Sequence, residues 1–238
     1  MAWEPVQRPT ELAEGRLVEA ILSGQFSADS SLPAERDLAS RLGVSRPTLR
    51  DALQRLARDG WVEIRHGRPT RVRDFWHEGN LAVLGAIARH QDPLPNGFVA
   101  SLLEVRLALA PAYTRLAIER SAPAVADLLE DYSSLPDSAE TFASADWHLH
   151  HVLALGSGNA VFTLILNGFG DLYLTLAQRY FASPGTRQHS REFYLRLLAA
   201  ARAGDAPEAE YLTRQVMAEA LELWERIEWP DTTPGQED

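Results

Sequence analysis

Residues 32–73, LPAERDLASRLGVSRPTLRDALQRLARDGWVEIRHGRPTRVR, decide the fold of the first part of this chain. The stretch predicts one helix over about residues 34–42 and a second over residues 46–58, because apolar residues recur at helical spacing in both. Gly43 and Gly60 follow these helices at positions that favour a positive φ, which glycine adopts without steric cost. Ser45 is placed to cap the second helix.

A β-hairpin is predicted directly after the second helix. Residues 61–65 and 70–73 alternate apolar and polar side chains around the short connection HGRP. Two short helices, a glycine turn and a hairpin together indicate a winged helix-turn-helix, in which the start of the second helix reaches base edges in the major groove of DNA. Between Arg41 and Arg73 the chain holds nine arginines against three acidic residues, which favours a DNA-binding surface over an ordinary solvated face.

The two parts of the chain differ in charge. Residues 1–75 hold 12 arginines and 11 acidic residues, whereas residues 76–238 hold 11 and 22. Phosphate would attract the arginine-rich region and repel the acidic one. The chain has no cysteine, which excludes disulfides and thiolate metal sites. It shows no signal-peptide pattern and no apolar run of 18 residues, so we expect a cytoplasmic protein without membrane contact.

The domain organisation follows from these patterns. Residues 1–73 are predicted to form the DNA-binding domain, with a first helix over residues 11–22 behind the two-helix unit. Residues 74–79 form a linker whose aromatic side chains are expected to pack rather than to act as a flexible tether.

The remainder of the chain has helical apolar spacing throughout. Helices are predicted over residues 78–91, 98–121, 122–133, 138–157, 159–183, 188–203 and 205–228. The fold class is therefore mainly α: an N-terminal winged helix-turn-helix with a small β-ribbon, followed by an antiparallel seven-helix bundle over residues 80–229. Residues 230–238 are expected to form a disordered tail.

Several motifs resemble a known family. LPAER, a helix and then SRPTLRDALQRLARDGW resemble the DNA-binding domain of the GntR family almost without gaps. RLARDGW, HGRPTRV, SGNAVFTLILNG and RYFASP further resemble, over about residues 8–228, the FadR group of that family, which are acyl-CoA-responsive regulators of fatty-acid metabolism. The resemblance implies that a long-chain fatty acyl-CoA binds in the helical bundle and releases the protein from DNA. It also implies repression of fatty-acid degradation and activation of unsaturated fatty-acid synthesis.

The resemblance also implies which residues meet DNA. On the two helices these are Arg36, Ser45, Arg46, Thr48 and Arg50, where the arginines contact bases or phosphates and the hydroxyls position them. At the wing tip His66 and Gly67 are expected in the adjacent minor groove. Because one short reading helix covers a half-site, we expect a homodimer on a pseudo-palindromic operator in double-stranded DNA.

Arg106 is the first candidate for an effector site. It falls on an apolar stripe of its predicted helix, between Leu102 and Leu109. A buried guanidinium needs a partner, and the residues alone leave two possibilities open. The partner is either an anionic ligand or an internal carboxylate such as Asp146 or Asp171.

Four further residues are effector candidates. Tyr173 and Tyr180 share an aromatic stripe, and Arg214 and Trp224 lie about three turns apart on the last helix. Taken by themselves, both patterns are more typical of core packing than of a ligand site. The resemblance implies that Arg106 and these four residues lie at or near the ligand cavity. Met217 and Ala220 stand where the FadR group has a glycine and a serine, which affects the expected preference for acyl-chain length.

A metal and a catalytic site are both disfavoured. Asp146 and His150 lie four residues apart on a helix and could share an ion, and related GntR bundles bind metal through one aspartate and three histidines. Tyr194 and Val216 stand at the other two histidine positions, and two ligands do not make a closed site, so we expect no metal and no other cofactor. The chain has no glycine-rich phosphate loop and no G-x-S-x-G or H-E-x-x-H motif. We therefore expect that the protein is not an enzyme. The open alternative is a GntR-type regulator that responds to another small organic acid, through a metal.

Overall fold

The structure is a computed structural model that describes residues 8–226, apart from the side chains of Asp171, Glu225 and Arg226. The predicted tail, residues 230–238, lies outside the described residues. The chain divides into two compact units, Met1–Leu94 and Pro95–Asp238. The predicted fold class is confirmed, because the described residues are mainly helical and contain one two-stranded sheet.

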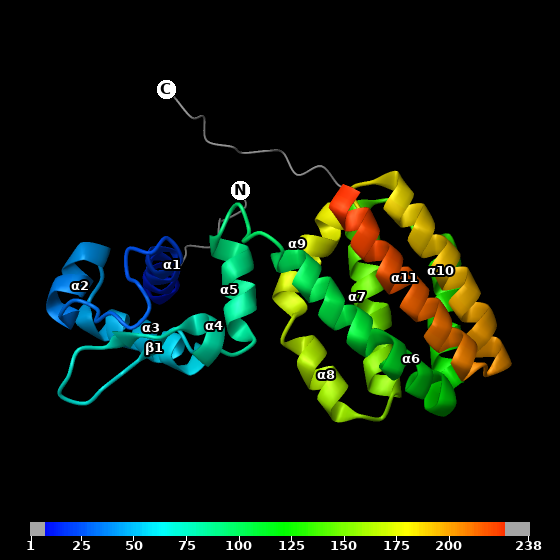
Figure 1. Cartoon of the computed structure of the whole chain (residues 1–238), viewed down its shortest axis with the longest axis horizontal. Helices are drawn as coiled ribbons and strands as arrows, with labels where there is room; N and C mark the ends of the chain where they lie inside the picture. Colours follow the sequence, from blue (N-terminus) through cyan, green and yellow to red (C-terminus); the bar gives the residue numbers. More distant parts are fainter. Residues whose placement is uncertain (1–7, 227–238) are drawn as a thin grey trace, which may run out of the picture. The chain divides into compact units, whose positions relative to one another are not determined.

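The first unit is a winged helix-turn-helix (Figure 1). Its elements are α1 (Pro9–Leu22), α2 (Glu35–Leu42), α3 (Arg46–Asp59), β1 (Val62–Glu63), β2 (Arg71–Val72), α4 (Phe75–Glu78) and α5 (Ala82–His90). Leu17, Leu49, Leu56 and Trp61 are fully buried and form the centre of its core. The antiparallel strands pair Val62 with Val72 and Glu63 with Arg71.

The helix ends predicted within residues 32–73 are confirmed. Gly43 and Gly60 take the left-handed conformation after α2 and α3, with φ of 69° and 96°. Ser45 caps α3, because its side chain accepts a hydrogen bond from the backbone N–H of Thr48 at 3.2 Å. Each of these residues acts on its own helix end, which is why the sequence alone predicts them.

Helix α5 packs with the first unit, whereas the sequence predicted it as part of the bundle. It lies against α1, where Gly15 leaves room for the ring of His90: a Cβ at residue 15 would lie 2.9 Å from His90 Cε1. The Nδ1 atom of His90 also lies 3.2 Å from Glu19 Oε1 on α1. The apolar spacing of α5 showed that the helix buries one face, but not which unit covers that face.

The second unit is a helical bundle. Its elements are α6 (Phe98–Asp131), a short 3₁₀ turn η1 (Tyr132–Ser134), α7 (Ala139–Gly156), α8 (Ala160–Asn167), α9 (Gly170–Tyr180), α10 (Pro184–Ala203) and α11 (Ala206–Arg226). The core lies mainly between α6, α7, α10 and α11, with Phe142, Leu149, Leu153 and Leu197 fully buried. Helix α6 covers two predicted helices, joined at a kink where Ser121 has non-helical angles.

The predicted single helix over residues 159–183 is wrong, because the chain breaks at Gly168 and Phe169 into α8 and α9. The two helices are bent by 75°. Glycine is a poor helix former, so packing decides whether a helix continues through it. Gly170 opens α9 against α7, where a Cβ would lie 3.4 Å from Cζ2 of Trp147.

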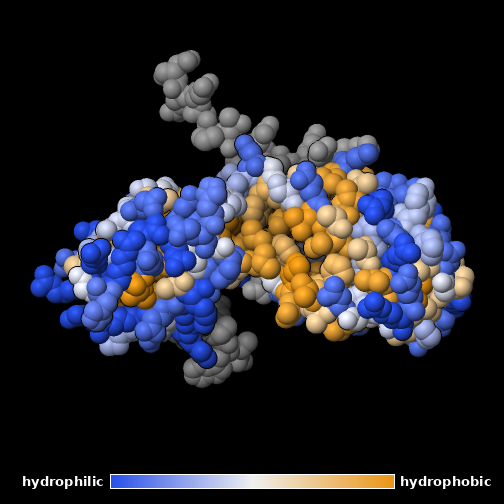
Figure 2. All heavy atoms as spheres, turned by 60° about the horizontal axis from the view of Figure 1, so that its bottom comes forward, coloured by the Kyte–Doolittle hydropathy of each residue, from blue (hydrophilic) through white to orange (hydrophobic). Residues whose placement is uncertain are grey.

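Surface polarity differs between the two units. The visible surface of the first unit is mostly hydrophilic, and the largest apolar area in view lies on the second unit (Figure 2). Exposed apolar residues of α8 include Val161 and Leu164. Among the described residues no single helix is long and apolar enough to cross a membrane, while α8 and α9 together meet the length and composition criteria as a bent pair.

Candidate functional site

The start of α3 presents the predicted DNA-reading residues. Arg46 is exposed, and Thr48 is half-buried with its hydroxyl 2.7 Å from that of Ser45. Arg50 is also exposed, and its Nε donates to Glu35 Oε2 of α2 at 2.7 Å. Ser45 and Thr48 therefore fix the first turn of α3, while the two arginines extend into solvent from it.

The remaining predicted DNA contacts come from α2 and from the wing. Arg36 is 84% exposed and pairs with the adjacent Asp37 at 3.2 Å. His66 and Gly67 are exposed in the loop between β1 and β2, and Gly67 has a φ of 68°, which the turn requires. Within the first unit, α2 and this loop lie at the same end, away from α5 (Figure 1).

A cavity of about 110 Å³ lies inside the second unit, between α6, α7, α8, α9 and α11. Its wall is almost entirely apolar and includes Leu109, Phe162, Phe169 and Leu176. The predicted effector residues that line it are Arg106, Tyr173, Tyr180 and Trp224. The structure thus brings together four residues that lie as far apart as α6 and α11 in the sequence.

Arg214 does not line this cavity. Its side chain is 57% exposed, and Nη2 donates to Glu210 Oε1 on the same helix at 3.3 Å. Met217 is buried and also lies outside the cavity wall, whereas Ala220 forms part of the wall. The helical spacing put Arg214 and Trp224 on one face of α11, but the cavity reaches only the end of that helix that carries Trp224.

A buried polar cluster closes one side of the cavity. Arg106 Nη2 donates to Asp146 Oδ2 at 2.6 Å and lies 2.5 Å from His150 Nε2. The hydroxyl of Tyr173 donates to Asp146 Oδ2, and that of Tyr194 donates to Oδ1 at 3.0 Å. The carboxylate alternative for the partner of Arg106 is therefore the one that the structure shows, with Asp146 as that partner.

The hydrogen bonds also assign the tautomer of His150. A guanidinium can only donate, so Nε2 of His150 accepts from Arg106. Nδ1 then carries the proton and donates to the hydroxyl of Tyr113 at 2.6 Å. His150 is wholly buried, and burial together with the charge of Arg106 lowers its pKa to about 3, so the imidazole is neutral.

The charges of the cluster compensate each other. Burial acts to raise the pKa of Asp146, but the Arg106 charge outweighs it, and the pKa is lowered. Burial acts to lower the pKa of Arg106, but the surrounding tyrosines and Asp146 raise it. One cation and one anion therefore face the cavity together, and the neutral imidazole of His150 lies buried behind them. Nε of Arg106 is buried without a hydrogen-bond partner.

The residues present do not fit a metal ion. Asp146 Oδ1 and His150 Nε2 lie 3.9 Å apart, and a nitrogen of Arg106 is in hydrogen-bonding contact with both side chains. The guanidinium thus takes the place that a cation would need. In the described part of the chain, no three His, Cys, Asp or Glu side chains gather as a metal site.

Comparison with known proteins identifies the family. Residues 9–72 match the bacterial regulatory proteins of the gntR family, and residues 73–230 match the FadR C-terminal domain. The chain belongs to the GntR family. Its C-terminal part is a FadR-type domain, so the division of family matches falls between β2 and α4.

Relatives at high coverage agree with this assignment. The chain is 42% identical over 219 residues to the fatty acid metabolism regulator protein of Shewanella sp. strain MR-4, covering 91% of this chain and 90% of the relative. It is 41% identical over 212 residues to the protein of the same name from Pectobacterium atrosepticum, covering 89% and 85%. GntR-family proteins of this kind are transcriptional regulators and not enzymes. This chain is therefore a transcriptional regulator.

A solved structure shows the same fold. The Listeria monocytogenes regulator described as Lar, which controls expression of the agr system, aligns with a TM-score of 0.61 at 18% identity and covers 96% of this chain and 100% of its own. At that identity the likeness concerns the fold alone. As a GntR-family regulator, the chain binds DNA through its winged helix-turn-helix and carries a ligand-binding domain of FadR type.

Proposed function

We propose that this protein is a cytoplasmic, homodimeric regulator of fatty acid metabolism that long-chain acyl-CoA releases from its operator. It represses fatty-acid degradation and activates unsaturated fatty-acid synthesis. The names of its relatives support the pathway. The cavity of the second unit supports the ligand class. The observation that carries the proposal is that Arg106, the cation on the cavity wall, is already neutralised by Asp146.

The cavity suits an acyl chain better than a small organic acid. A carboxylate that leaves water needs a cation to offset its desolvation. Arg106 is already neutralised by Asp146, and the rest of the wall is apolar or carries tyrosine hydroxyls. An alkyl chain gains free energy on such a wall at about 25 cal/mol per Å² of apolar surface buried. A small acid that displaced Asp146 from Arg106 would leave that buried aspartate without a counter-ion.

The size of the cavity links ligand binding to a change of conformation. The volume of about 110 Å³ is smaller than the cavity of about 150 Å³ that holds benzene in an engineered protein. A long acyl chain does not fit within this volume, so the wall must move to enclose it, and α8 and α9 form part of that wall. Ligand then stabilises a bundle arrangement different from the present one, in proportion to its preference for that arrangement.

At the DNA, two copies place Arg46 and Arg50 of each α3 in successive major grooves, with Arg36 at the adjacent backbone. His66 and Gly67 of each wing enter the neighbouring minor groove. The change in the bundle moves the two reading helices out of register with their half-sites, because half-site spacing is set by dimer geometry.

Calorimetric titration with oleoyl-CoA tests the ligand class. The matched variants are Ala220→Phe, which fills the cavity from α11, and Ala218→Phe, on the exposed side of the same helix. We expect oleoyl-CoA to bind the wild type and Ala218→Phe alike and Ala220→Phe at least about tenfold more weakly, the loss that corresponds to about 1.4 kcal/mol.

Parallel titrations with citrate and other small organic acids, with and without zinc, test the alternative effector class. Binding of such an acid in the absence of oleoyl-CoA binding contradicts the proposed ligand. Because the guanidinium of Arg106 stands at the place of a metal, we expect zinc to change none of these titrations.

A further inference from the structure

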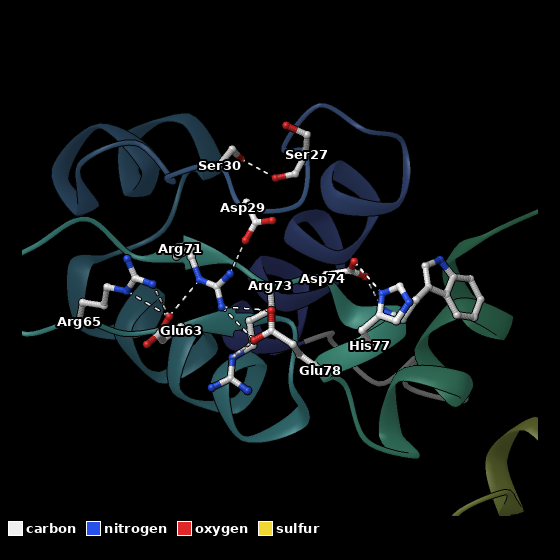
Figure 3. Close-up of polar contacts among 11 residues, drawn as sticks. Ser27, Asp29, Ser30, Glu63, Arg65, Arg71, Arg73, Asp74, His77 and Glu78 are labelled. Atoms are coloured by element: carbon white, nitrogen blue, oxygen red, sulfur yellow. Dashed lines mark hydrogen bonds and ion pairs between the residues drawn. The ribbon is translucent and has the colours of Figure 1, made fainter.

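Three carboxylates converge on the guanidinium of Arg71 in β2 (Figure 3). Its Nε donates to Glu63 Oε2 at 3.0 Å, and its Nη2 donates to both carboxylate oxygens of Glu78, at 2.8 and 3.1 Å. Nη1 donates to Asp29. The side chain of Arg71 is only 18% exposed. Each of its three nitrogens is thus engaged by a different segment of the first unit.

Two of these segments are already tied to β2 by the backbone. Glu63 lies on β1, which pairs with β2 directly. Asp29 lies in the loop before α2, and its backbone N–H donates to the carbonyl of Val72 at 2.9 Å. Glu78 is different, because it lies at the end of α4. The side chain of Arg71 therefore reinforces the first two connections and, with Arg73 Nε at 3.9 Å from Glu78 Oε2, supplies the side-chain link between the wing and α4.

The segment that contains α4 also lies against the end of α3 and the residues that follow it. The ring of Phe75 is 4.8 Å from that of Trp61, which directly follows α3 and Gly60. The contact is too close for side chains at its centre: a Cβ on Gly60 would lie 2.7 Å from Cα of Gly79. The side-chain amide of Asn80 donates to the carbonyl of Arg58 at 3.0 Å. One short helix thus contacts both the end of the reading helix and the base of the wing.

Helix α4 belongs, by sequence, to the region of FadR type. The match to the FadR C-terminal domain begins at residue 73, two residues before α4. Asp74 caps this helix by accepting from the backbone of Trp76 at 3.2 Å and contacts His77 Nδ1 at 2.8 Å. The segment that leads out of the DNA-binding domain is therefore a capped helix, and Glu78 joins it to Arg71 of the wing.

We propose that Arg71 is a positioning residue that aligns the wing for DNA by holding Glu78 of α4, so that a displacement of α4 also displaces the wing. The inference rests on the proposed function, since it takes the wing tip as a DNA contact. An ion pair with a purely structural role would change stability alone. A positioning role makes the effect of Glu78 on DNA binding depend on the wing tip.

A double-mutant cycle separates these roles. Full-length wild type, Glu78→Gln, His66→Ala and the double variant are titrated by fluorescence anisotropy at one fixed salt concentration. The probe is a duplex that the wild-type protein selects from a randomised library. Glu14→Gln is the matched control, in both backgrounds, because it removes the same charge from an ion pair with Arg55 at 3.7 Å, between α1 and α3. It reports the general gain in DNA affinity on loss of a negative charge.

We expect Glu78→Gln to bind the duplex about threefold to tenfold more weakly than Glu14→Gln does, a loss of the size that one partly buried ion pair supports. In the His66→Ala background the two variants should bind alike. Glu78→Asp, which keeps the charge, should recover part of the affinity. Thermal unfolding of each variant is recorded alongside. The effect of Glu78→Gln on the unfolding temperature should not depend on whether His66 is present.

Two results overturn the positioning role. One is Glu78→Gln matching Glu14→Gln in the presence of His66. The other is a loss with Glu78→Gln that persists unchanged in the His66→Ala background. If His66→Ala alone leaves the DNA affinity unchanged, the wing contact of the proposed function is refuted, and the positioning role with it. The first two results, by contrast, leave the wing contact intact.

Discussion

Arg106 and Asp146 form a buried ion pair beside the cavity, with side chains 21% and 6% exposed. Such a pair is costly to break on one side, because the remaining charge stays buried without compensation. The two residues are 40 positions apart in the sequence and come from α6 and α7. The pair therefore connects two helices of the bundle as well as neutralising the cavity.

Removal of the Asp146 charge should destabilise the second unit. We expect Asp146→Asn to lower the free energy of unfolding by about 3 kcal/mol, the cost of leaving a buried charge unpaired. The control is Glu130→Gln, whose partner Arg202 is 59% exposed, and it should cost less than about 1 kcal/mol. Urea unfolding, monitored by hydrogen exchange of amides in the second unit, gives the free energy of unfolding of both variants. Equal losses in the two variants would contradict the buried pair.

The buried imidazole of His150 should make stability depend on pH. The folded state keeps His150 neutral with a pKa lowered to about 3, whereas the unfolded chain takes up a proton below about 6.5. Unfolding therefore binds a proton in this window, and stability falls as the pH falls from about 6.5 towards 3. The slope from this one group is about 1.4 kcal/mol per pH unit. At the acid end, protonation of Asp146 adds to the loss.

The variant that tests this slope is His150→Asn, with His148→Asn on the exposed side of α7 as its control. Unfolding free energies are measured between pH 7 and 4. His150→Asn should have a flatter dependence on pH than the wild type, while His148→Asn should keep the wild-type slope. A wild-type slope in both variants would mean that His150 is not the titrating group.

Arg46 is the residue on which specific DNA binding is expected to depend most. One good arginine–guanine contact discriminates by about 1–3 kcal/mol. Arg46→Ala should therefore raise the dissociation constant for a selected duplex by about tenfold or more. Arg58→Ala, which removes the same charge from the other end of α3, is the control. An anisotropy titration in which the two variants lose equal affinity would refute the assignment of the reading residues.

At the scale of elements, α3 lies between two left-handed glycines that differ in their surroundings. A Cβ at Gly43 would meet nothing within 4 Å, whereas one at Gly60 would lie 2.7 Å from the backbone of Gly79. Gly43→Ala should cost about 1 kcal/mol, the strain of a left-handed residue. Gly60→Ala should cost more, because α4 must also move. Hydrogen exchange of α3 amides measures both, and equal costs would contradict the close packing of α4.

At the scale of the whole molecule, the coupling between ligand and DNA must be reciprocal. If oleoyl-CoA lowers operator affinity by some factor, saturating operator must lower oleoyl-CoA affinity by the same factor. Calorimetry with the selected duplex, and with a scrambled duplex as control, measures this directly. Equal oleoyl-CoA affinity with and without the selected duplex would exclude an allosteric release.

The helix that carries most of the predicted DNA contacts could be predicted well from the sequence. The second helix was predicted over residues 46–58 and spans Arg46–Asp59. Its cap, its terminal glycine and the exposure of its arginines depend on contacts within a few residues, which sequence patterns report. The three ion pairs of Arg71 could not be predicted from the sequence, because the carboxylates come from residues 29, 63 and 78 and leave no local pattern.

For the second unit, the sequence by itself determined that helices with apolar faces would bury a core, and it placed Arg106, Tyr173, Tyr180 and Trp224 among the candidates. Only the tertiary structure decided that Asp146 pairs with Arg106, that Arg214 lies outside the cavity wall, and that the chain breaks between α8 and α9. Periodicity along one helix shows which face is buried. It cannot show which distant helix covers that face, and each of these outcomes depends on that packing.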